Sequence, residues 1–198
     1  MPGQKRKTRG QPPGRLRIVA GKWRRRLLPV VNQEGLRPTA ERIRETLFNW
    51  LAPIIEGSRC LDLFAGTGAL GLEALSRGAR ETVFVESAEA AVRQLNASID
   101  LLQAEGAVVI RRDARDFLNN ATPEIFDVVY LDPPFAADYY EELCRLLAEK
   151  NWVRVGTRVY LEQDAGAAQP VLPPGWLVER QKTAGKVRYT LLRVAEKE

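Results

Sequence analysis

Short apolar segments alternate regularly with longer amphipathic ones between residues 58 and 162. The short segments read as buried strands, and the longer ones carry apolar residues at helical spacing. The predicted strands are residues 59–64, 82–86, 108–111, 126–131 and 158–162. The predicted helices are residues 69–77, 88–102 and 139–149. This alternation indicates an α/β fold with a parallel sheet covered by helices on both faces.

The C-terminal part of the chain breaks this alternation. Residues 176–181 and 186–194 both read as strands, and the segment Lys182-Thr183-Ala184-Gly185 between them is typical of a turn. A mostly parallel sheet that ends in such a hairpin must contain an antiparallel strand.

The composition of the chain excludes several classes of protein. With 198 residues, 45% of them hydrophobic, the chain suffices for one catalytic-size domain. No apolar run approaches the ~20 residues of a membrane-spanning helix. The absence of histidine excludes His-based catalysis, and Cys60 and Cys144 are too few for a disulfide framework, which favours a cytoplasmic location. We expect these two cysteines, with Trp152 and Trp176, to be core residues.

Positive charge is concentrated at the N-terminus. Residues 1–31 hold ten basic residues and no acidic one, so the remainder of the chain holds 20 basic and 25 acidic residues. This asymmetry favours a polyanionic partner, either nucleic acid or an anionic surface, held at one end of the protein. A solubilising tail is the alternative.

The N-terminal residues divide into a tail, a hairpin and a helix. Residues 15–19 and 23–31 read as a basic β-hairpin, and Thr39 can cap a helix that ends at Pro53. Its buried face is expected at Ile43, Leu47, Trp50 and Leu51. The predicted organisation is a disordered basic tail at 1–14, a hairpin and helix at 15–57, and the main domain at 58–198.

A glycine-rich turn follows the first strand of the main domain. Gly66, Gly68 and Gly71 match the G-x-G-x-x-G pattern of nucleotide-binding loops. Asp62 lies near the end of the same strand, where its charge would repel a pyrophosphate. A cationic ligand is favoured instead, and S-adenosylmethionine carries an ammonium and a sulfonium against one carboxylate.

Two further acids follow the next two strands. Glu86 is placed to accept hydrogen bonds from ribose hydroxyls, and Asp113, with the Ala114 backbone nearby, from an adenine amino group. The carboxyl ends of parallel strands form the ligand-bearing edge of such sheets. The alternative for Asp62 and Asp113 is that they are loop or capping acids.

The segment Asp132-Pro133-Pro134-Phe135 follows the fourth strand. The two prolines make a rigid turn. Asp132 and the Pro133 carbonyl can then accept from one NH₂ group while Phe135 stacks on a planar base. Such acceptors turn the amine lone pair toward a methyl donor and stabilise the charge that develops on nitrogen. A buried Pro-Pro turn with no function is the alternative.

With these motifs, the chain resembles class I S-adenosylmethionine-dependent methyltransferases and, more closely, the bacterial RsmD family, which methylates guanine N2 in 16S ribosomal RNA. The resemblance covers nearly everything after residue 14. It rests on Arg17-Ile18-Val19-Ala20-Gly21, Arg37-Pro38-Thr39, residues 42–50, residues 62–74 and Asp132-Pro133-Pro134-Phe135.

The resemblance implies a Rossmann-like, seven-stranded, mostly parallel sheet with an antiparallel C-terminal hairpin. It also implies a 16S ribosomal RNA substrate, which we expect within a small-subunit assembly particle, with naked RNA as the alternative. Nothing in the sequence demands more than a monomer. The implied target-binding residues are Asp132, Pro133, Pro134 and Phe135. The implied cofactor-binding residues are Arg37, Thr39, Asp62, Phe64, Ala65, Gly66, Thr67, Gly68, Glu86, Asp113, Ala114 and Asp132. Ser87 stands where many relatives carry a second acid, so nucleoside recognition rests more heavily on Glu86.

Two other functions remain open from the sequence. The same chemistry would serve an adenine-N6 DNA methyltransferase or a protein-glutamine methyltransferase, although their signature is more often Asn-Pro-Pro-Tyr. A nucleic-acid-binding module with no cofactor is the non-enzymatic alternative.

Overall fold

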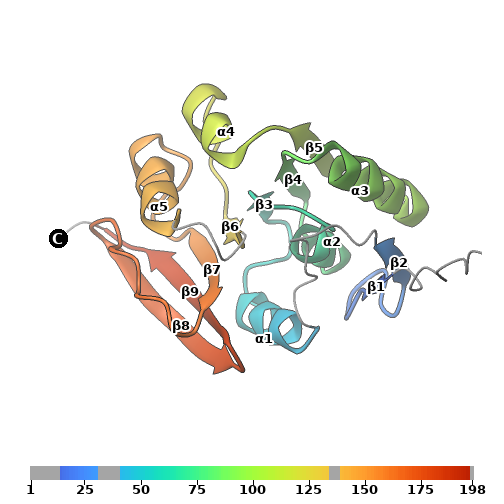
Figure 1. Ribbon diagram of the computed structural model, residues 1–198, viewed down its shortest axis with the longest axis horizontal. Helices are drawn as coiled ribbons and strands as arrows, with labels where there is room; N and C mark the ends of the chain where they lie inside the picture. Colours follow the sequence, from blue (N-terminus) through green and yellow to red (C-terminus); the bar gives the residue numbers. More distant parts are fainter. Residues whose placement is uncertain (1–13, 31–40, 134–138, 197–198) are drawn as a thin grey trace, which may run out of the picture.

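The computed structural model describes residues 14–30, 41–133 and 139–196 (Figure 1). The strands are β1 (Gly14–Arg17), β2 (Leu27–Val30), β3 (Arg59–Asp62), β4 (Glu81–Glu86), β5 (Ala107–Arg111), β6 (Val128–Leu131), β7 (Arg158–Asp164), β8 (Trp176–Ala184) and β9 (Val187–Val194). The helices are α1 (Glu41–Leu51), α2 (Ala69–Ser76), α3 (Glu89–Leu102), α4 (Ala114–Asn120) and α5 (Tyr140–Glu149).

Seven strands form the central sheet, in the order β5-β4-β3-β6-β7-β9-β8. Pairing is parallel from β5 to β7, and β9 runs antiparallel to both β7 and β8. The predicted mostly parallel sheet with an antiparallel C-terminal hairpin is therefore confirmed.

Helices cover both faces of this sheet. One core cluster joins α1, α2 and α3 to the face that carries Tyr130 and Tyr160. A second cluster joins α4 and α5 to the opposite face, which carries Leu131 and Leu161. Figure 1 shows α4 and α5 across the sheet from α1 and α2. The layers follow from the period of two along each strand, which sends alternate side chains to opposite faces.

The N-terminal hairpin is shorter than the sequence predicts. β1 and β2 pair antiparallel, but β2 begins only at Leu27, because residues 21–25 form turns. Trp23, expected in the second strand, lies in this turn region and is buried. Leu16 and Ile18 belong to the same core cluster as α1 and α2, so the hairpin is packed onto the main sheet's helical layer.

Two other differences lie at the ligand-bearing edge. The first strand of the main domain ends at Asp62 rather than at residue 64, where the chain enters the glycine turn. Helix α4 was not predicted at all; it has only seven residues, too few for a clear apolar period.

The residues expected to be structural are in the core. Cys60, Cys144, Trp152 and Trp176 are all buried. Across the described ranges, the structure has no helix long and apolar enough to cross a membrane.

Candidate active site

The parallel strands β3 to β7 all end at one edge of the sheet, and most of the predicted site residues follow these ends. Arg37, Thr39, Pro134 and Phe135 lie outside the described residues. Asp62, Glu86, Asp113 and Asp132 each stand at the end of a different strand. The order β5-β4-β3-β6 places these strand ends side by side.

The glycine turn between β3 and α2 depends on two glycines in particular. Gly68 has φ 75°, in the left-handed region, and a Cβ atom there would lie 2.4 Å from Leu95 Cδ1. A Cβ atom at Gly71 would lie 2.1 Å from Phe84 Cε1, so Gly71 allows α2 to pack closely on β4. Within the turn the Ala65 N–H donates to the Val85 carbonyl at 3.0 Å and the Gly68 N–H donates to the Ala65 carbonyl at 2.6 Å, so the backbone that leads into α2 has a fixed geometry.

Asp62 is buried below this turn, with 2% of its surface exposed. Its Oδ2 accepts a hydrogen bond from the Gly71 N–H at 3.1 Å. The pKa of the Asp62 carboxyl is raised to about 7, mainly by burial and to a smaller extent by the negative charge of Glu86, while backbone donors at Gly71 and Phe64 oppose the shift. An ionised Asp62 is therefore costly without a cation nearby.

Glu86 is half-buried at the end of β4 and holds the glycine turn. Its Oε2 accepts from the Gly66 N–H at 2.8 Å, and its Oε1 accepts from the Ala88 N–H at 2.7 Å. The sequence predicted a ribose acceptor here and did not indicate these backbone bonds. Each carboxylate oxygen can accept a second hydrogen bond, so both roles are compatible.

Asp113 caps helix α4. Its Oδ1 accepts from the N–H groups of Arg115 and Asp116, at 2.9 and 3.1 Å. The capping alternative weighed for Asp113 is therefore observed, and Ala114 is the buried first residue of the helix. The Asp113 side chain is about half exposed, so it can also contact a ligand.

Asp132 and Pro133 follow β6, whose four residues are all buried. Pro133 is buried and Asp132 is partly buried. The negative charge of Asp132 contributes to the raised pKa of Tyr160 on the neighbouring strand β7. The first two residues of the predicted target turn therefore sit at the sheet edge, next to β3 on one side and β7 on the other.

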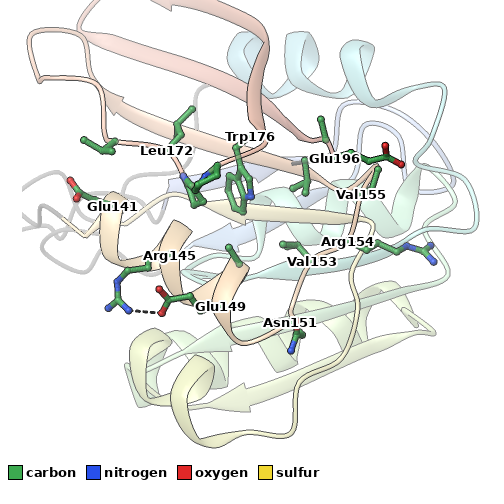
Figure 2. A pocket seen from close by; sticks show the side chains of 16 residues that line it. Glu141, Arg145, Glu149, Asn151, Val153, Arg154, Val155, Leu172, Trp176 and Glu196 are labelled. Carbon is green, nitrogen blue, oxygen red and sulfur yellow. Dashed lines mark hydrogen bonds and ion pairs between the residues drawn. The ribbon is translucent and has the colours of Figure 1, made fainter. Parts of the chain in front are cut away.

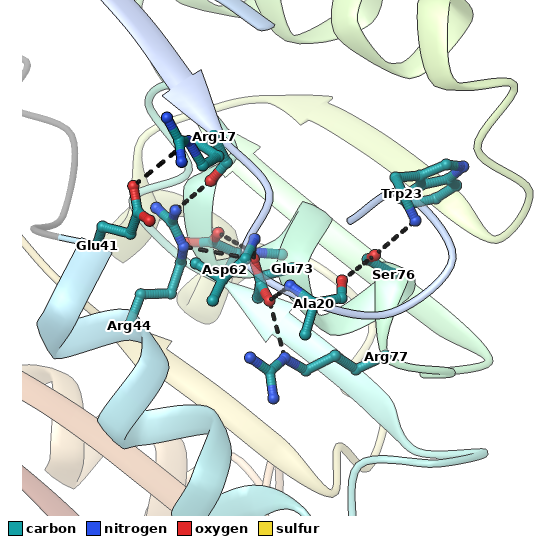
Figure 3. Close-up of polar contacts among 11 residues, drawn as sticks. Arg17, Ala20, Trp23, Glu41, Arg44, Asp62, Glu73, Ser76 and Arg77 are labelled. Atoms are coloured by element: carbon teal, nitrogen blue, oxygen red, sulfur yellow. Dashed lines mark hydrogen bonds and ion pairs between the residues drawn. The ribbon is translucent and has the colours of Figure 1, made fainter. Parts of the chain in front are cut away.

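A buried ion cluster joins this edge to the N-terminal hairpin, and the sequence did not predict it (Figure 3). Glu73 of α2 accepts from the backbone N–H groups of Val19 and Ala20, at 2.8 and 3.0 Å. Arg44 of α1, 1% exposed, lies with its Nε 3.5 Å from Glu73 Oε2 and donates to the Arg17 carbonyl. Arg77 Nε also donates a hydrogen bond to Glu73 Oε1, at 2.8 Å.

The hairpin is held at a second point on α2. Ser76 Oγ donates to the Ala20 carbonyl at 2.6 Å and accepts from the Trp23 N–H at 3.0 Å. Gly21 has φ 80°, and a Cβ atom there would lie 1.8 Å from the Ser76 carbonyl oxygen. The basic hairpin is therefore fixed to the helix that begins at the glycine turn.

A cavity lies elsewhere, between α5 and the segments that lead into and out of the C-terminal hairpin (Figure 2). Its volume is about 890 Å³, and its lining includes Arg145, Val153, Leu172 and Trp176. Val153 precedes β7, so this cavity is near the opposite edge of the sheet from the acidic strand ends. We do not assign the site to it.

Comparison with known proteins agrees with this geometry. The sequence model of the family described as "Conserved hypothetical protein 95", the RsmD family, matches residues 16–193. "Ribosomal RNA small subunit methyltransferase D" of Escherichia coli K12 is 44% identical over 179 residues, 90% of this chain and 89% of that protein. The protein of the same name from Haemophilus influenzae is 45% identical over 182 residues, 90% of this chain and 93% of that protein. The solved structure of Escherichia coli yhhF superposes with a TM-score of 0.86 at 40% identity, covering 92% of this chain and 99% of that chain.

The sheet order and the strand-end residues, with these comparisons, define an S-adenosylmethionine-dependent methyltransferase of the class I fold. Because the family model and these relatives span most of the chain, this protein belongs to the RsmD family. The resemblance seen in the sequence is thereby confirmed.

Proposed function

We propose that this protein transfers a methyl group from S-adenosylmethionine to the exocyclic N2 amine of a guanine in 16S ribosomal RNA. The observation that carries the proposal is the position of Asp132-Pro133: these residues follow a fully buried strand and lie one strand from the glycine turn. The relatives named ribosomal RNA small subunit methyltransferase D support an RNA substrate from the small subunit.

The acids of the sheet edge suit the charges of S-adenosylmethionine. Its sulfonium makes the attached methyl group electrophilic and gives the ligand a positive charge that a buried Asp62 and a half-buried Glu86 would attract. The backbone of Phe64, Ala65, Gly66, Thr67 and Gly68 would contact the ligand closely. Asp113 and the Ala114 N–H would contact its adenine, and we expect Arg37 and Thr39 to belong to the same binding site.

Cofactor affinity is expected to rise with pH up to about 7. The pKa of Asp62 is about 7 in the free protein, so at lower pH most molecules carry a neutral carboxyl that must lose its proton before it attracts a cation. The association constant should therefore rise by up to roughly tenfold per pH unit between about pH 5.5 and 7, then level off. Calorimetric titration with S-adenosylmethionine measures this profile.

The variant Asp62→Asn separates the effect of the Asp62 charge on cofactor binding from its effect on folding. The amide oxygen can still accept from the Gly71 N–H, so the site keeps its main contact. The raised pKa means that native Asp62 holds its proton to higher pH than the unfolded chain does, so its ionisation lowers stability as pH rises from about 4 to 7. The variant should thus melt no lower than wild type at pH 8, bind the cofactor roughly tenfold or more weakly, and lose the pH dependence. An unchanged profile in the variant would exclude Asp62 as the group responsible.

The target amine would be held by Asp132 and the Pro133 carbonyl. The lone pair of the guanine N2 atom is delocalised into the ring, so it is a poor nucleophile. Two acceptors that bind both N–H groups direct the lone pair toward the methyl group and stabilise the positive charge that develops on nitrogen. The rest of the rate acceleration would come from placing the guanine N2 atom, the methyl carbon and the sulfonium sulfur in line. Phe135 would stack on the target base after it flips out of the RNA.

The hairpin would bind RNA phosphates. Arg24, Arg25 and Arg26 are exposed in its connecting turn, and the bonds to Glu73 and Ser76 fix that turn to α2. Phosphate contacts add affinity and salt dependence without choosing the base. The basic tail at residues 1–14 would extend the same surface.

Removing two of these charges should weaken RNA binding and its dependence on salt. For Arg24→Gln/Arg26→Gln, we expect the slope of log K against log salt to fall by roughly 1–2. The matched control is Lys182→Gln/Lys186→Gln, which removes two exposed charges from the C-terminal hairpin. Equal slopes for the two variants would show that the N-terminal hairpin is no special RNA contact.

One experiment tests the substrate class. Labelled S-adenosylmethionine is incubated with the protein and separated RNA, DNA and protein fractions, with both naked 16S RNA and assembly particles in the RNA arm. Label confined to RNA supports the proposal, whereas label in DNA or protein favours the adenine-N6 or glutamine alternatives. A protein with no cofactor affinity would be a binding module only.

We also propose that the enzyme acts as a monomer, which sedimentation of the active species tests.

A further inference from the structure

A second carboxyl group lies beside Asp132, at the end of the neighbouring strand. β6 and β7 are parallel, and their last paired residues are Leu131 and Leu161. Asp132 and Glu162 each follow this pair. Neighbouring strands lie about 4.8 Å apart, so the two backbones are adjacent at the sheet edge.

The side chain of Glu162 shares the environment of Tyr160. Its Oε2 accepts a hydrogen bond from the Tyr160 hydroxyl at 2.7 Å. The negative charges of Glu162 and Asp132 both contribute to the raised pKa of Tyr160. Because Tyr130 pairs with Tyr160 in the register, the next residues whose side chains leave the same face are Asp132 and Glu162. The register therefore places Glu162 beside Asp132, within the surroundings of the proposed amine site.

Glu162 is held rigidly and has little water around it. Its surface is 5% exposed, the Tyr140 hydroxyl donates to its carbonyl oxygen, and Tyr189 of β9 pairs with it across the sheet. Burial raises the pKa of the Glu162 carboxyl, and the bond from Tyr160 opposes that shift. A buried carboxylate gains from every further donor, because it can accept about four hydrogen bonds.

The edge of guanine offers such a donor at the right place. Guanine carries an N1–H directly beside its N2 amine. If Asp132 and the Pro133 carbonyl bind the amine, a carboxylate one strand away meets the adjacent N1–H. Resting on the proposed function, we infer that Glu162 is a specificity-determining residue that accepts a hydrogen bond from guanine N1–H, while Tyr160 holds its other oxygen.

This arrangement discriminates against other amines. Adenine presents an unprotonated N1 acceptor beside its N6 amine, so its lone pair would face the Glu162 carboxylate. A site built to bind an N–H strongly rejects a base that lacks it, because buried polar groups are then left unpaired. Glu162 would thus select guanine, and Asp132 would hold the amine of whichever base enters.

The analogue 2-aminopurine isolates the contact, because it keeps the 2-amine but has an unprotonated N1. RNA with guanine or 2-aminopurine at the mapped target position is compared by kcat/KM. Wild type should favour guanine by roughly 10–100-fold. In Glu162→Gln the amide can turn its oxygen toward the N1–H of guanine or its N–H toward the unprotonated N1 of 2-aminopurine, so the preference should shrink to below about threefold. Glu149→Gln, an exposed change on α5, is the matched control and should keep the wild-type preference.

The outcomes separate this inference from the proposed function. Wild-type protein that methylates guanine and 2-aminopurine equally well overturns the role of Glu162 and leaves guanine-N2 methylation standing. The same holds if Glu162→Gln, with a wild-type melting temperature, keeps the full preference for guanine. Failure of wild type to methylate guanine in any RNA would instead overturn the proposed function. If the Gln variant does not fold, the wild-type comparison of the two bases alone still decides.

Discussion

Asp132→Ala is expected to lower the rate of methyl transfer by roughly 10²–10³-fold, with S-adenosylmethionine affinity near that of wild type. In the proposed reaction, the carboxylate would stabilise charge that develops on the amine in the transition state and does not exist in the ground state. Its removal therefore acts on kcat more than on cofactor binding. Single-turnover methylation and a calorimetric titration measure the two quantities on one sample.

A matched control guards against a general loss of structure. Asp100→Ala also removes one carboxylate, but from the exposed surface of α3, and should leave both quantities unchanged. If Asp132→Ala turns over RNA at the wild-type rate, the assignment of the Asp-Pro-Pro-Phe turn to the target amine is wrong. If cofactor affinity falls as much as the rate of methyl transfer, Asp132 binds the cofactor rather than the target amine.

Glu73→Ala is expected to destabilise the protein by about 3–5 kcal/mol, which corresponds to a fall in melting temperature of roughly 6–20 °C for a chain of this size. Glu73 is 0% exposed and is the partner of Arg44 and Arg77. Its removal leaves the Arg44 guanidinium buried without its counter-charge. Burial lowers the pKa of the Arg44 guanidinium, and the negative charge of Glu73 is the largest cause that opposes this shift.

The variant also removes the acceptor of the Val19 and Ala20 N–H groups, which hold the hairpin on α2. Salt-dependent RNA binding should therefore weaken even where the protein remains folded.

The control variant Glu149→Ala, which breaks an exposed pair with Arg145, should change stability by less than about 1 kcal/mol. In Glu73→Ala/Arg44→Met the fully buried cation is gone and only the partly exposed Arg77 lacks its partner, so the double variant should be more stable than Glu73→Ala alone. A melting temperature near wild type in Glu73→Ala would refute the structural role of the cluster.

The sheet could be predicted because its strands are buried on both faces. Segments such as Val128–Leu131, in which every residue is buried, read as short apolar runs between polar turns. Helices of ten or more residues, such as α3, show a clear apolar period. The strand ends were harder to fix, because Leu63 and Phe64 are apolar but already belong to the glycine turn.

Helix α4 and the ion cluster were missed for different reasons. The seven residues of α4 span two turns, and its cap Asp113 was interpreted as a ligand contact. Arg44 and Glu73 are charged residues on helices, which periodicity assigns to the solvent side. Their burial depends on contacts between residues 27 or more positions apart in the chain, and a single sequence carries no signal for that.

The candidate site was predicted in part. The glycine turn and the acids at the strand ends followed from the alternation, because parallel strands end at one edge. The backbone bonds of Glu86 and the position of Glu162 did not follow, since they depend on the register between strands. The roles assigned to the residues of the candidate site remain predictions, including those of Arg37, Thr39, Pro134 and Phe135.

Nucleoside analysis of methylated RNA decides most directly what this enzyme makes. Unmodified 16S RNA, naked or in assembly particles, is incubated with the protein and S-adenosylmethionine, digested and separated. We predict one new product, N2-methylguanosine, absent when Asp132→Ala replaces wild type. Methylation only at adenine N6, only at another atom of guanine, or at no nucleoside of 16S RNA would contradict the proposed reaction.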